Sequence, residues 1–219
     1  PHNPSGRVWT REELEQVEGI CRKHDLLVFS DEIHSDIVYA PNKHIVFASL
    51  SPWSREHSIV AMAPSKTFNL AGLQTSNIFI PNRTLRKTFK KAIDQAGYSQ
   101  LNTLGLVACQ AAYEEGEPWL TELKKYLLGN LDFSRNYIER NLPGIHLIEP
   151  EGTYLIWLDF RELGLPEEKL EHLITKEAKL WLDSGAIFGT DGEGFERINI
   201  ACPRTTLKEA FDRLAKALN

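Results

Sequence analysis

The chain has 219 residues, and its 25 lysines and arginines are outnumbered by 30 aspartates and glutamates, which gives a formal net charge of -5. This acidic balance argues against nucleic-acid or membrane-surface binding as the main task, and no apolar run approaches the length of a membrane span. The three cysteines are odd in number and far apart, which favours reduced thiols in a cytoplasmic protein, and the histidines lack the spacing typical of metal ligands.

The first part of the chain predicts a loop, a helix and a strand in that order. Asn3 lies in an opening loop rich in proline and glycine. Thr10 and Glu13 then form a capping-box pattern, and apolar residues recur after them at helical spacing. The apolar run 26–30 has the character of a buried parallel strand, and Asp31 stands at its carboxyl end.

A second apolar run, residues 59–63, predicts another buried strand, and Lys66 follows it in a short loop. In open α/β sheets, ligands bind beyond the carboxyl ends of the strands. Asp31 and Lys66 are therefore expected at the same edge. Side chains alternate along a strand, so Asp31 and Ile33 should share one face while Glu32 points to the other.

The remaining elements suggest two domains, 1–117 and 118–219. The first would be the C-terminal part of a large domain with a mostly parallel sheet, and the second an interdomain helix with a small α+β domain. The later elements are predicted as a strand at 77–80, a helix at 85–96, a long helix at 118–141, a strand at 154–158, a helix at 167–181, a strand at 197–201, and a last helix to 218 whose start is marked by Thr206 and Glu209.

Lys66, Asp31 and Asn3 together indicate a pyridoxal phosphate (PLP) site. A lysine amine condenses with the cofactor aldehyde and later serves as a base. A carboxylate such as Asp31 keeps the pyridine nitrogen protonated, and an amide such as Asn3 can donate to the phenolate oxygen. Each residue alone has an ordinary explanation, as a solvated lysine, a capping aspartate or a turn asparagine. Their joint occurrence favours the cofactor.

Four segments carry a resemblance to a known family. The opening 1–6 (PHNPSG) resembles the Asn-Pro-x-Gly signature of fold-type I PLP enzymes of the aminotransferase class I/II superfamily. Segments 30–36 (SDEIHSD) and 65–73 (SKTFNLAGL) resemble more narrowly the cystathionine β-lyase branch, the MalY/PatB type of C–S lyase. Segment 197–204 (RINIACPR) matches the part of the family that holds the arginine for the substrate carboxylate. The resemblance implies an α/β, PLP-dependent transferase-like fold.

The resemblance also implies a role for each candidate residue. Lys66 would be the catalytic residue that bonds to the cofactor aldehyde, and Arg204 would hold the substrate α-carboxylate through its planar fork. Ser65 would reach the cofactor phosphate. Strand alternation, which places Ile33 on the face of Asp31, predicts that Ile33 packs on the ring. His34 remains open between a hydrogen bond that tunes the cofactor and a structural histidine.

The implied activity is α,β-elimination of L-cystathionine or a related S-substituted cysteine to a thiol, pyruvate and ammonia. An aminotransferase is an alternative, because it shares every step through removal of the Cα proton. A regulatory or dimerisation module without turnover is another. No strand precedes Pro1, so we expect the chain to be the C-terminal part of a longer protein, which would act as a homodimer in the family's manner.

Overall fold

The computed structural model describes residues 1–98 and 100–218, which form two compact units. The first unit holds Pro1 and Val8–Glu122, and the second holds His2–Arg7 and the chain from Leu123 onward. We keep the predicted domains, 1–117 and 118–219, as a proposal, because compactness alone does not define a functional domain. No helix in the described part of the chain is long and apolar enough to cross a membrane.

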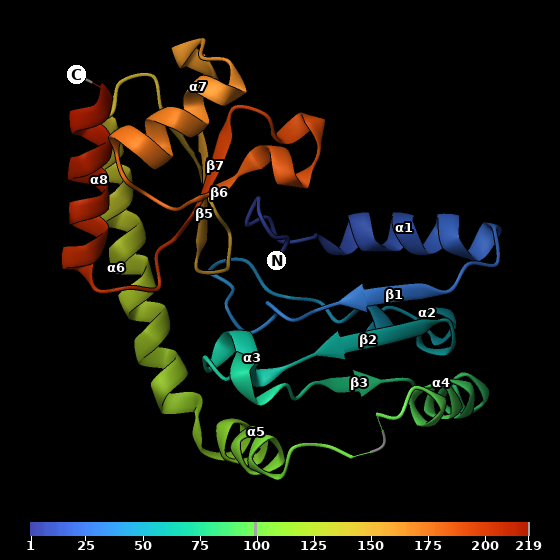
Figure 1. Cartoon of the computed structure of the whole chain (residues 1–219). Helices are drawn as coiled ribbons and strands as arrows, with labels where there is room; N and C mark the ends of the chain where they lie inside the picture. Colours follow the sequence, from blue (N-terminus) through green and yellow to red (C-terminus); the bar gives the residue numbers. More distant parts are fainter. Residues whose placement is uncertain (99, 219) are drawn as a thin grey trace. The chain divides into compact units, whose positions relative to one another are not determined.

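The first unit is built on a three-stranded sheet in the order β1-β2-β3 (Figure 1). Strand β1 (Val28–Asp31) pairs in parallel with β2 (Ser58–Met62), with Asp31 opposite Ala61. Strand β3 (Asn77–Phe79) pairs with β2 in the antiparallel direction. The three strands predicted in this region are confirmed to within two residues at each end. Parallel pairing places the carboxyl ends of β1 and β2 at one edge, as expected.

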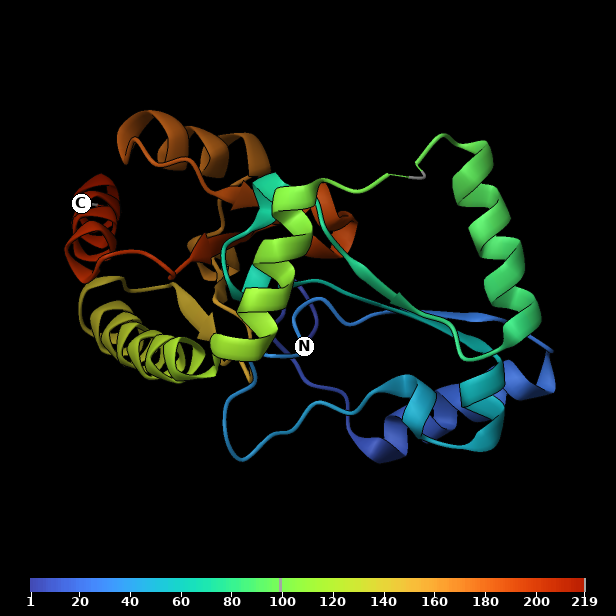
Figure 2. The same cartoon turned by 90° about the horizontal axis from the view of Figure 1, so that it is seen from below.

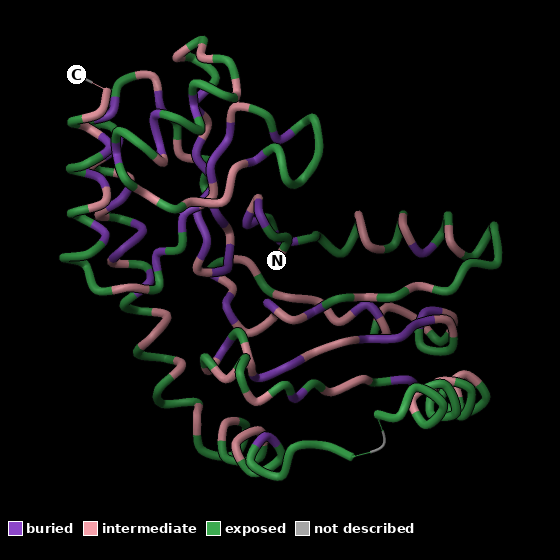
Figure 3. The backbone as a smooth tube through the Cα atoms, in the orientation of Figure 1, coloured by how far each residue is buried: buried purple, intermediate pink, exposed green. Residues whose placement is uncertain are grey.

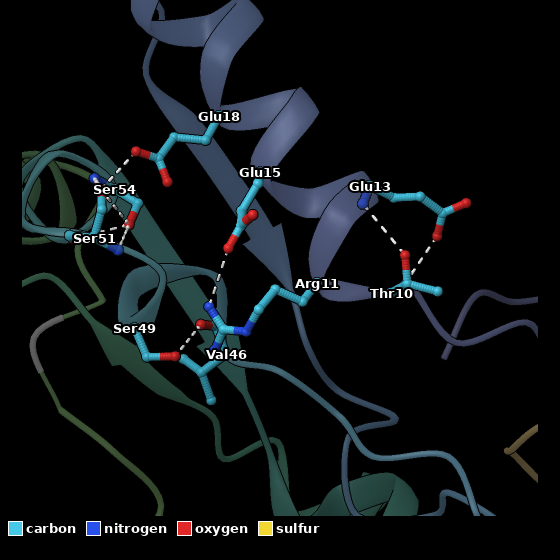
Figure 4. Close-up of polar contacts among 9 residues, drawn as sticks. All are labelled: Thr10, Arg11, Glu13, Glu15, Glu18, Val46, Ser49, Ser51 and Ser54. Carbon is cyan, nitrogen blue, oxygen red and sulfur yellow. Dashed lines mark hydrogen bonds and ion pairs between the residues drawn. The ribbon is translucent and has the colours of Figure 1, made fainter.

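Helix α1 (Arg11–Lys23) precedes β1 and begins with the predicted capping box. The Thr10 N–H donates to Glu13 Oε2 at 2.9 Å, and the Glu13 N–H donates to Thr10 Oγ1 at 3.3 Å (Figure 4). Further along the same helix, Glu18 is buried and its Oε1 accepts from Ser51 Oγ at 2.5 Å. Ser51 also caps the short helix α2 (Pro52–Glu56), so one side chain of α1 fixes the segment that leads into β2.

Three more helices complete the first unit. Helix α3 (Pro64–Thr67) follows β2, α4 (Arg83–Gln95) follows β3, and α5 (Thr103–Glu115) lies beside α3 (Figures 1 and 2). Helix α4 was predicted, whereas α2 and α5 were not. Apolar side chains lie on several sides of α5 and show no helical period, which is why the sequence did not reveal it. Short 3-10 turns cover Phe47–Ser49 and Ala71–Leu73.

The second unit contains a four-stranded antiparallel sheet in the order β4-β5-β7-β6. The long helix α6 starts at the end of the first unit and continues into the second, where Leu127 and Leu131 are buried. In the second unit, Figure 3 shows buried residues along the central strands β5 and β7 and at intervals along helices α6 and α8. The elements are α6 (Glu117–Asn141), β4 (His146–Ile148), β5 (Leu155–Asp159), α7 (Glu167–His172), β6 (Asp183–Ser184), β7 (Phe195–Asn199) and α8 (Arg204–Leu218), with 3-10 turns at Arg161–Leu163, Gly185–Phe188 and Thr190–Gly192.

Two helix boundaries of the second unit correct the prediction. The helix expected at 167–181 ends earlier, because α7 passes into a π-helical turn at Leu173–Glu177 and Lys179 then adopts φ +53°, which no helix continues. Trp181, expected in the helix, is 94% exposed. The last helix starts at Arg204 directly after Pro203, so Thr206 lies inside α8 and is not its cap.

Candidate functional site

Asp31 and Glu32 are adjacent carboxylates with opposite surroundings. Asp31, the last residue of β1, is exposed, and its Oδ1 accepts from the Ile33 N–H at 3.2 Å. Glu32 is 4% exposed. Strand alternation predicts this difference, since it sends neighbouring side chains to opposite faces.

The Glu32 carboxylate is held by donors from three positions. Its Oε1 accepts from Ser30 Oγ at 2.9 Å and from the Phe47 N–H at 3.0 Å. Its Oε2 lies 2.7 Å from His44 Nε2. A buried carboxylate needs such partners to be tolerated, so Glu32 has a structural role that fastens the loop before β2 to the end of β1. Asp31 is left as the carboxylate that can meet a ligand.

The residues after Asp31 turn back into the unit. Ile33 is half-buried, and His34 is 6% exposed. The depth of His34 fits a histidine enclosed by the fold, and it leaves both predicted roles of this side chain open.

Lys66 lies in α3, at the carboxyl end of β2. The residues that lead into α3 are buried: Ala63 is 5% exposed, and Pro64 is also buried. Proline at the first helical position starts the short turn, and Ser65 is half-buried within it. Lys66 itself is exposed. The predicted placement of Lys66 just beyond the second strand agrees with this geometry.

The residues that follow Lys66 anchor its loop. The Phe68 ring lies 5.7 Å from the Trp119 ring and meets Tyr113 edge-on at 6.2 Å, centroid to centroid. Gly116 lies under Phe68, where a Cβ atom would come within 2.4 Å of the ring. The absence of a side chain at residue 116 therefore lets Phe68 pack closely.

In the second unit, Asn3 pairs with Arg197 of β7. Arg197 Nη1 donates to Asn3 Oδ1 at 2.7 Å. The other edge of the guanidinium binds Asp183 of β6, with Nε at 3.1 Å and Nη2 at 2.5 Å from the same carboxylate oxygen. The guanidinium carbon lies 5.1 Å from the centre of the Phe188 ring. Arg197 is therefore held in one orientation by a carboxylate, an amide and an aromatic face.

Aromatic side chains line the same face of this sheet. Trp157 of β5 stacks on Phe195 of β7 with the ring centres 5.2 Å apart, and it meets Phe188 edge-on at 5.6 Å. Tyr154 precedes β5, and burial raises the pKa of its hydroxyl while the charge of Arg197 acts in the opposite direction. Arg197 thus lies among rings that limit its contact with water.

Arg204 has a different environment. Its Nε donates to Asn130 Oδ1 of α6 at 2.9 Å, and its guanidinium lies 5.6 Å from the Phe133 ring. Asn130 is fully buried and also donates to the carbonyls of Ile200 and Cys202. The structure therefore pairs Arg204 with helix α6 and pairs Arg197 with Asn3.

Arg197 is a candidate site residue that the sequence alone did not single out. It begins the segment 197–204 whose resemblance was noted, and the alternation of polar and apolar residues in 197–201 (RINIA) was a usable signal. Its partners were not, because Asn3 is 194 residues away along the chain. Among the described residues, no group of three or more histidine, cysteine or acidic side chains is arranged to hold a metal ion.

The family model for aminotransferase class I and II matches residues 1–214. The chain belongs to this family. It is 42% identical over 219 residues to the cystathionine beta-lyase PatB of Bacillus subtilis, and the match covers all of this chain and 57% of that protein. The chain therefore spans little more than half the length of such relatives.

Solved structures of this family have the same fold. A PLP-bound putative aminotransferase from Clostridium difficile matches with a TM-score of 0.98 and 45% identity, over 100% of this chain and 57% of that one. Cystalysin from Treponema denticola, which contains PLP, matches with a TM-score of 0.97 and 41% identity, over 100% of this chain and 55% of that one. The predicted α/β, fold-type I class is confirmed.

Proposed function

We propose that the protein is a PLP-dependent carbon–sulfur lyase that acts on L-cystathionine or a related S-substituted cysteine. One observation carries the proposal most directly: an exposed Lys66 at the carboxyl end of β2 accompanies an exposed Asp31 at the carboxyl end of the adjacent parallel strand. The similarity to a cystathionine beta-lyase supports the choice of reaction. The products would be a thiol, pyruvate and ammonia.

The donor set fits PLP. Lys66 can bond to the aldehyde. Of the two adjacent carboxylates, Asp31 is the one that can face the pyridine nitrogen, because Glu32 already accepts hydrogen bonds from other donors. Asn3 accepts a hydrogen bond at Oδ1 from Arg197, so its Nδ2 amide is the end that can donate to the phenolate oxygen. Each of the three side chains therefore has the chemical group that its predicted contact with PLP requires.

PLP, when bound, supplies a conjugated ring that accepts the electrons released at the substrate Cα. Lys66 would hold the aldehyde carbon of the cofactor, and its amine, once released, would remove the Cα proton from the substrate. The negative charge of Asp31 would keep the pyridine nitrogen protonated. In the overall reaction the bond between Cβ and sulfur breaks, sulfur leaves as a thiol, and water replaces the amino group to give pyruvate.

Arg197 replaces Arg204 in our proposal as the residue that binds the substrate α-carboxylate. Its contact with Asn3 supports this choice, because Asn3 is the candidate phenolate ligand. Asp183 takes the edge formed by Nε and Nη2, and Asn3 takes one hydrogen of Nη1, so one hydrogen of Nη1 and one of Nη2 remain for the end of the guanidinium. A planar carboxylate can meet that end with two parallel hydrogen bonds.

The deciding experiment is covalent capture of PLP. The purified chain is incubated with PLP and borohydride, and the reduced adduct is located by mass spectrometry of peptides. We expect the adduct on Lys66, with loss of specific capture in Asp31→Ala. Capture spread over several surface lysines would overturn the proposal. If a longer protein containing this chain captures PLP on Lys66 and the chain alone does not, the cofactor assignment stands for the longer protein.

An aminotransferase is the second candidate, favoured by the similarity to a putative aminotransferase of known structure. Product analysis separates the two functions. Pyruvate and thiol formed from L-cystathionine without an added keto acid support the lyase. Turnover that requires a keto-acid acceptor supports the aminotransferase.

We also propose that the protein acts as a homodimer in the cytoplasm, with a small amino-acid substrate as its ligand. The family match supports an amino-acid substrate. Light scattering on the purified protein tests the dimer, because a monomeric mass at micromolar concentration contradicts it.

A further inference from the structure

Asp31 ends β1 and Lys66 lies in α3, so their relative placement depends on what joins the two segments that follow the strands. The ladder between β1 and β2 continues to the hydrogen bond from the Glu32 N–H to the Ala61 carbonyl, at 2.8 Å. Past this point, Thr67 Oγ1 donates to Asp36 Oδ2 at 2.7 Å. Asp36 lies on the loop that follows Asp31, and Thr67 is the residue directly after Lys66.

The position of Thr67 controls the direction of Lys66. Thr67 is 1% exposed, whereas Lys66 is exposed. Successive side chains of a helical turn point about 100° apart, so a turn that buries Thr67 directs Lys66 outward. A buried hydroxyl that donates to a carboxylate forms a charge-assisted hydrogen bond, which is stronger than a neutral one. This bond therefore resists rotation of the turn that carries Lys66.

Asp36 also faces helix α5. Burial is the main cause of the raised pKa of the Tyr113 hydroxyl, and the negative charge of Asp36 raises that pKa further. Tyr113 in turn packs against Phe68, the residue after Thr67. Asp36 thus lies at a junction between the loop after β1, the turn of α3 and the helix α5.

We propose that Asp36 and Thr67 are positioning residues that set the direction of the Lys66 amine relative to the Asp31 carboxylate. This inference rests on the proposed PLP function. Both residues act through Lys66, and their hydrogen bond fixes the separation of the two loops beyond the end of the strand ladder. Its loss lets the α3 turn rotate, so that fewer molecules hold the amine in the orientation that reaches the cofactor aldehyde.

The test compares Thr67→Val, which keeps the shape and removes the hydroxyl, with Thr67→Ser, which keeps the hydroxyl. In Thr67→Val, the rate of PLP capture on Lys66 should fall by about tenfold or more, because the variant loses the free energy of a hydrogen bond to a charged group. Thr67→Ser should remain within about twofold of the parent by the same reasoning. The control is Thr88→Val, which removes an exposed hydroxyl that donates to the Thr84 carbonyl in α4.

Amide hydrogen exchange gives a readout that needs no cofactor. Exchange across residues 32–37 and 63–70 should be faster in Thr67→Val, and close to the parent in Thr67→Ser and Thr88→Val. Asp36→Asn keeps an acceptor oxygen and removes the charge, so its exchange rates should lie between those of Thr67→Val and the parent. This second variant decides the matter if Thr67→Val fails to fold.

Equal exchange and equal capture in Thr67→Val and the parent would overturn the inference, as would equal losses in Thr67→Ser and Thr67→Val. Failure of the proposed function looks different. In that case the parent chain and any longer protein containing it show no specific capture on Lys66, while the exchange rates still report whether the hydrogen bond orders the two loops.

Discussion

The surroundings of Lys66 in the first unit and of Arg197 in the second differ in how the reactive group is held. Lys66 is exposed, and its neighbours Thr67 and Phe68 are the residues that are anchored. Arg197 is itself anchored, by Asp183, Asn3 and the Phe188 ring. Under the proposed function, Lys66 must bond to the cofactor, be released from it and act as a base, which requires a mobile amine on a fixed turn. An arginine that binds a carboxylate needs a fixed fork.

The largest effect is expected from replacing Lys66, in comparison with replacing an ordinary exposed lysine. Lys66→Ala should abolish covalent capture and lower turnover by about 10³-fold or more, because it removes both the bonding amine and the base. Lys43→Ala is the matched control, since Lys43 is also an exposed lysine of the first unit. Peptide mapping after borohydride reduction and a pyruvate assay measure the two quantities. Equal capture in Lys66→Ala and the parent would rule out the proposed role.

The second prediction compares the two arginines of the second unit. Arg197→Lys should raise KM for the amino-acid substrate by about 10- to 100-fold, because an ammonium cannot reproduce two parallel hydrogen bonds to a carboxylate. Arg204→Lys should lower the thermal midpoint through loss of its bond to Asn130, with a much smaller change in KM. Steady-state kinetics and thermal unfolding of both variants provide the measurement. A larger KM effect at residue 204 would restore the role predicted from the sequence.

The third prediction concerns Asp31 and Glu32, which differ in burial although they are adjacent. Glu32→Ala should lower the free energy of unfolding by about 1–3 kcal/mol, because it leaves the half-buried Ser30 hydroxyl and the buried Phe47 N–H without an acceptor. Asp31→Asn should change that free energy little, since residue 31 is exposed, while weakening PLP binding. Denaturant unfolding and PLP titration distinguish the two. Comparable destabilisation by both changes would contradict the assignment.

Much of the fold could be predicted because its signals are local. The capping box of Thr10 and Glu13 and the apolar runs that form β1 and β2 need no knowledge of distant residues. Strand β6 escaped prediction because it has two residues and exists through its pairing with β7. The start of α8 was misplaced because Thr206 and Glu209 imitate a capping box inside a helix that Pro203 already begins.

The candidate site could likewise be predicted only where its signals are local. Strand alternation distinguished Asp31 from Glu32, and the structure agrees with that distinction. The choice between Arg197 and Arg204 depends on tertiary partners, since Asp183 lies 14 residues from Arg197 and Asn130 lies 74 residues from Arg204. No local pattern reports such contacts.

The last prediction contrasts two buried glutamates. Glu32 is surrounded by donors, whereas Glu196 of β7 is 2% exposed near other acidic groups. Burial, and then the charges of Glu167, Asp183 and Glu171, raise the pKa of Glu196 to about 8 from its ordinary 4.5. Between these values the folded protein binds a proton that the unfolded chain does not, so stability falls as the pH rises through this window.

Glu196→Gln should remove this dependence, because its amide stays neutral at every pH. The difference in unfolding free energy between the variant and the parent should therefore change in favour of the variant by about 1 kcal/mol per pH unit as the pH rises from about 5 to 8. Denaturant unfolding at several pH values measures it, and Glu193→Gln is the control because Glu193 is exposed. A parallel pH profile for Glu196→Gln and the parent would mean that the Glu196 carboxylate is ionised in the folded protein. Glu196 would then need donors, as Glu32 does, and the contrast between the two buried carboxylates would disappear.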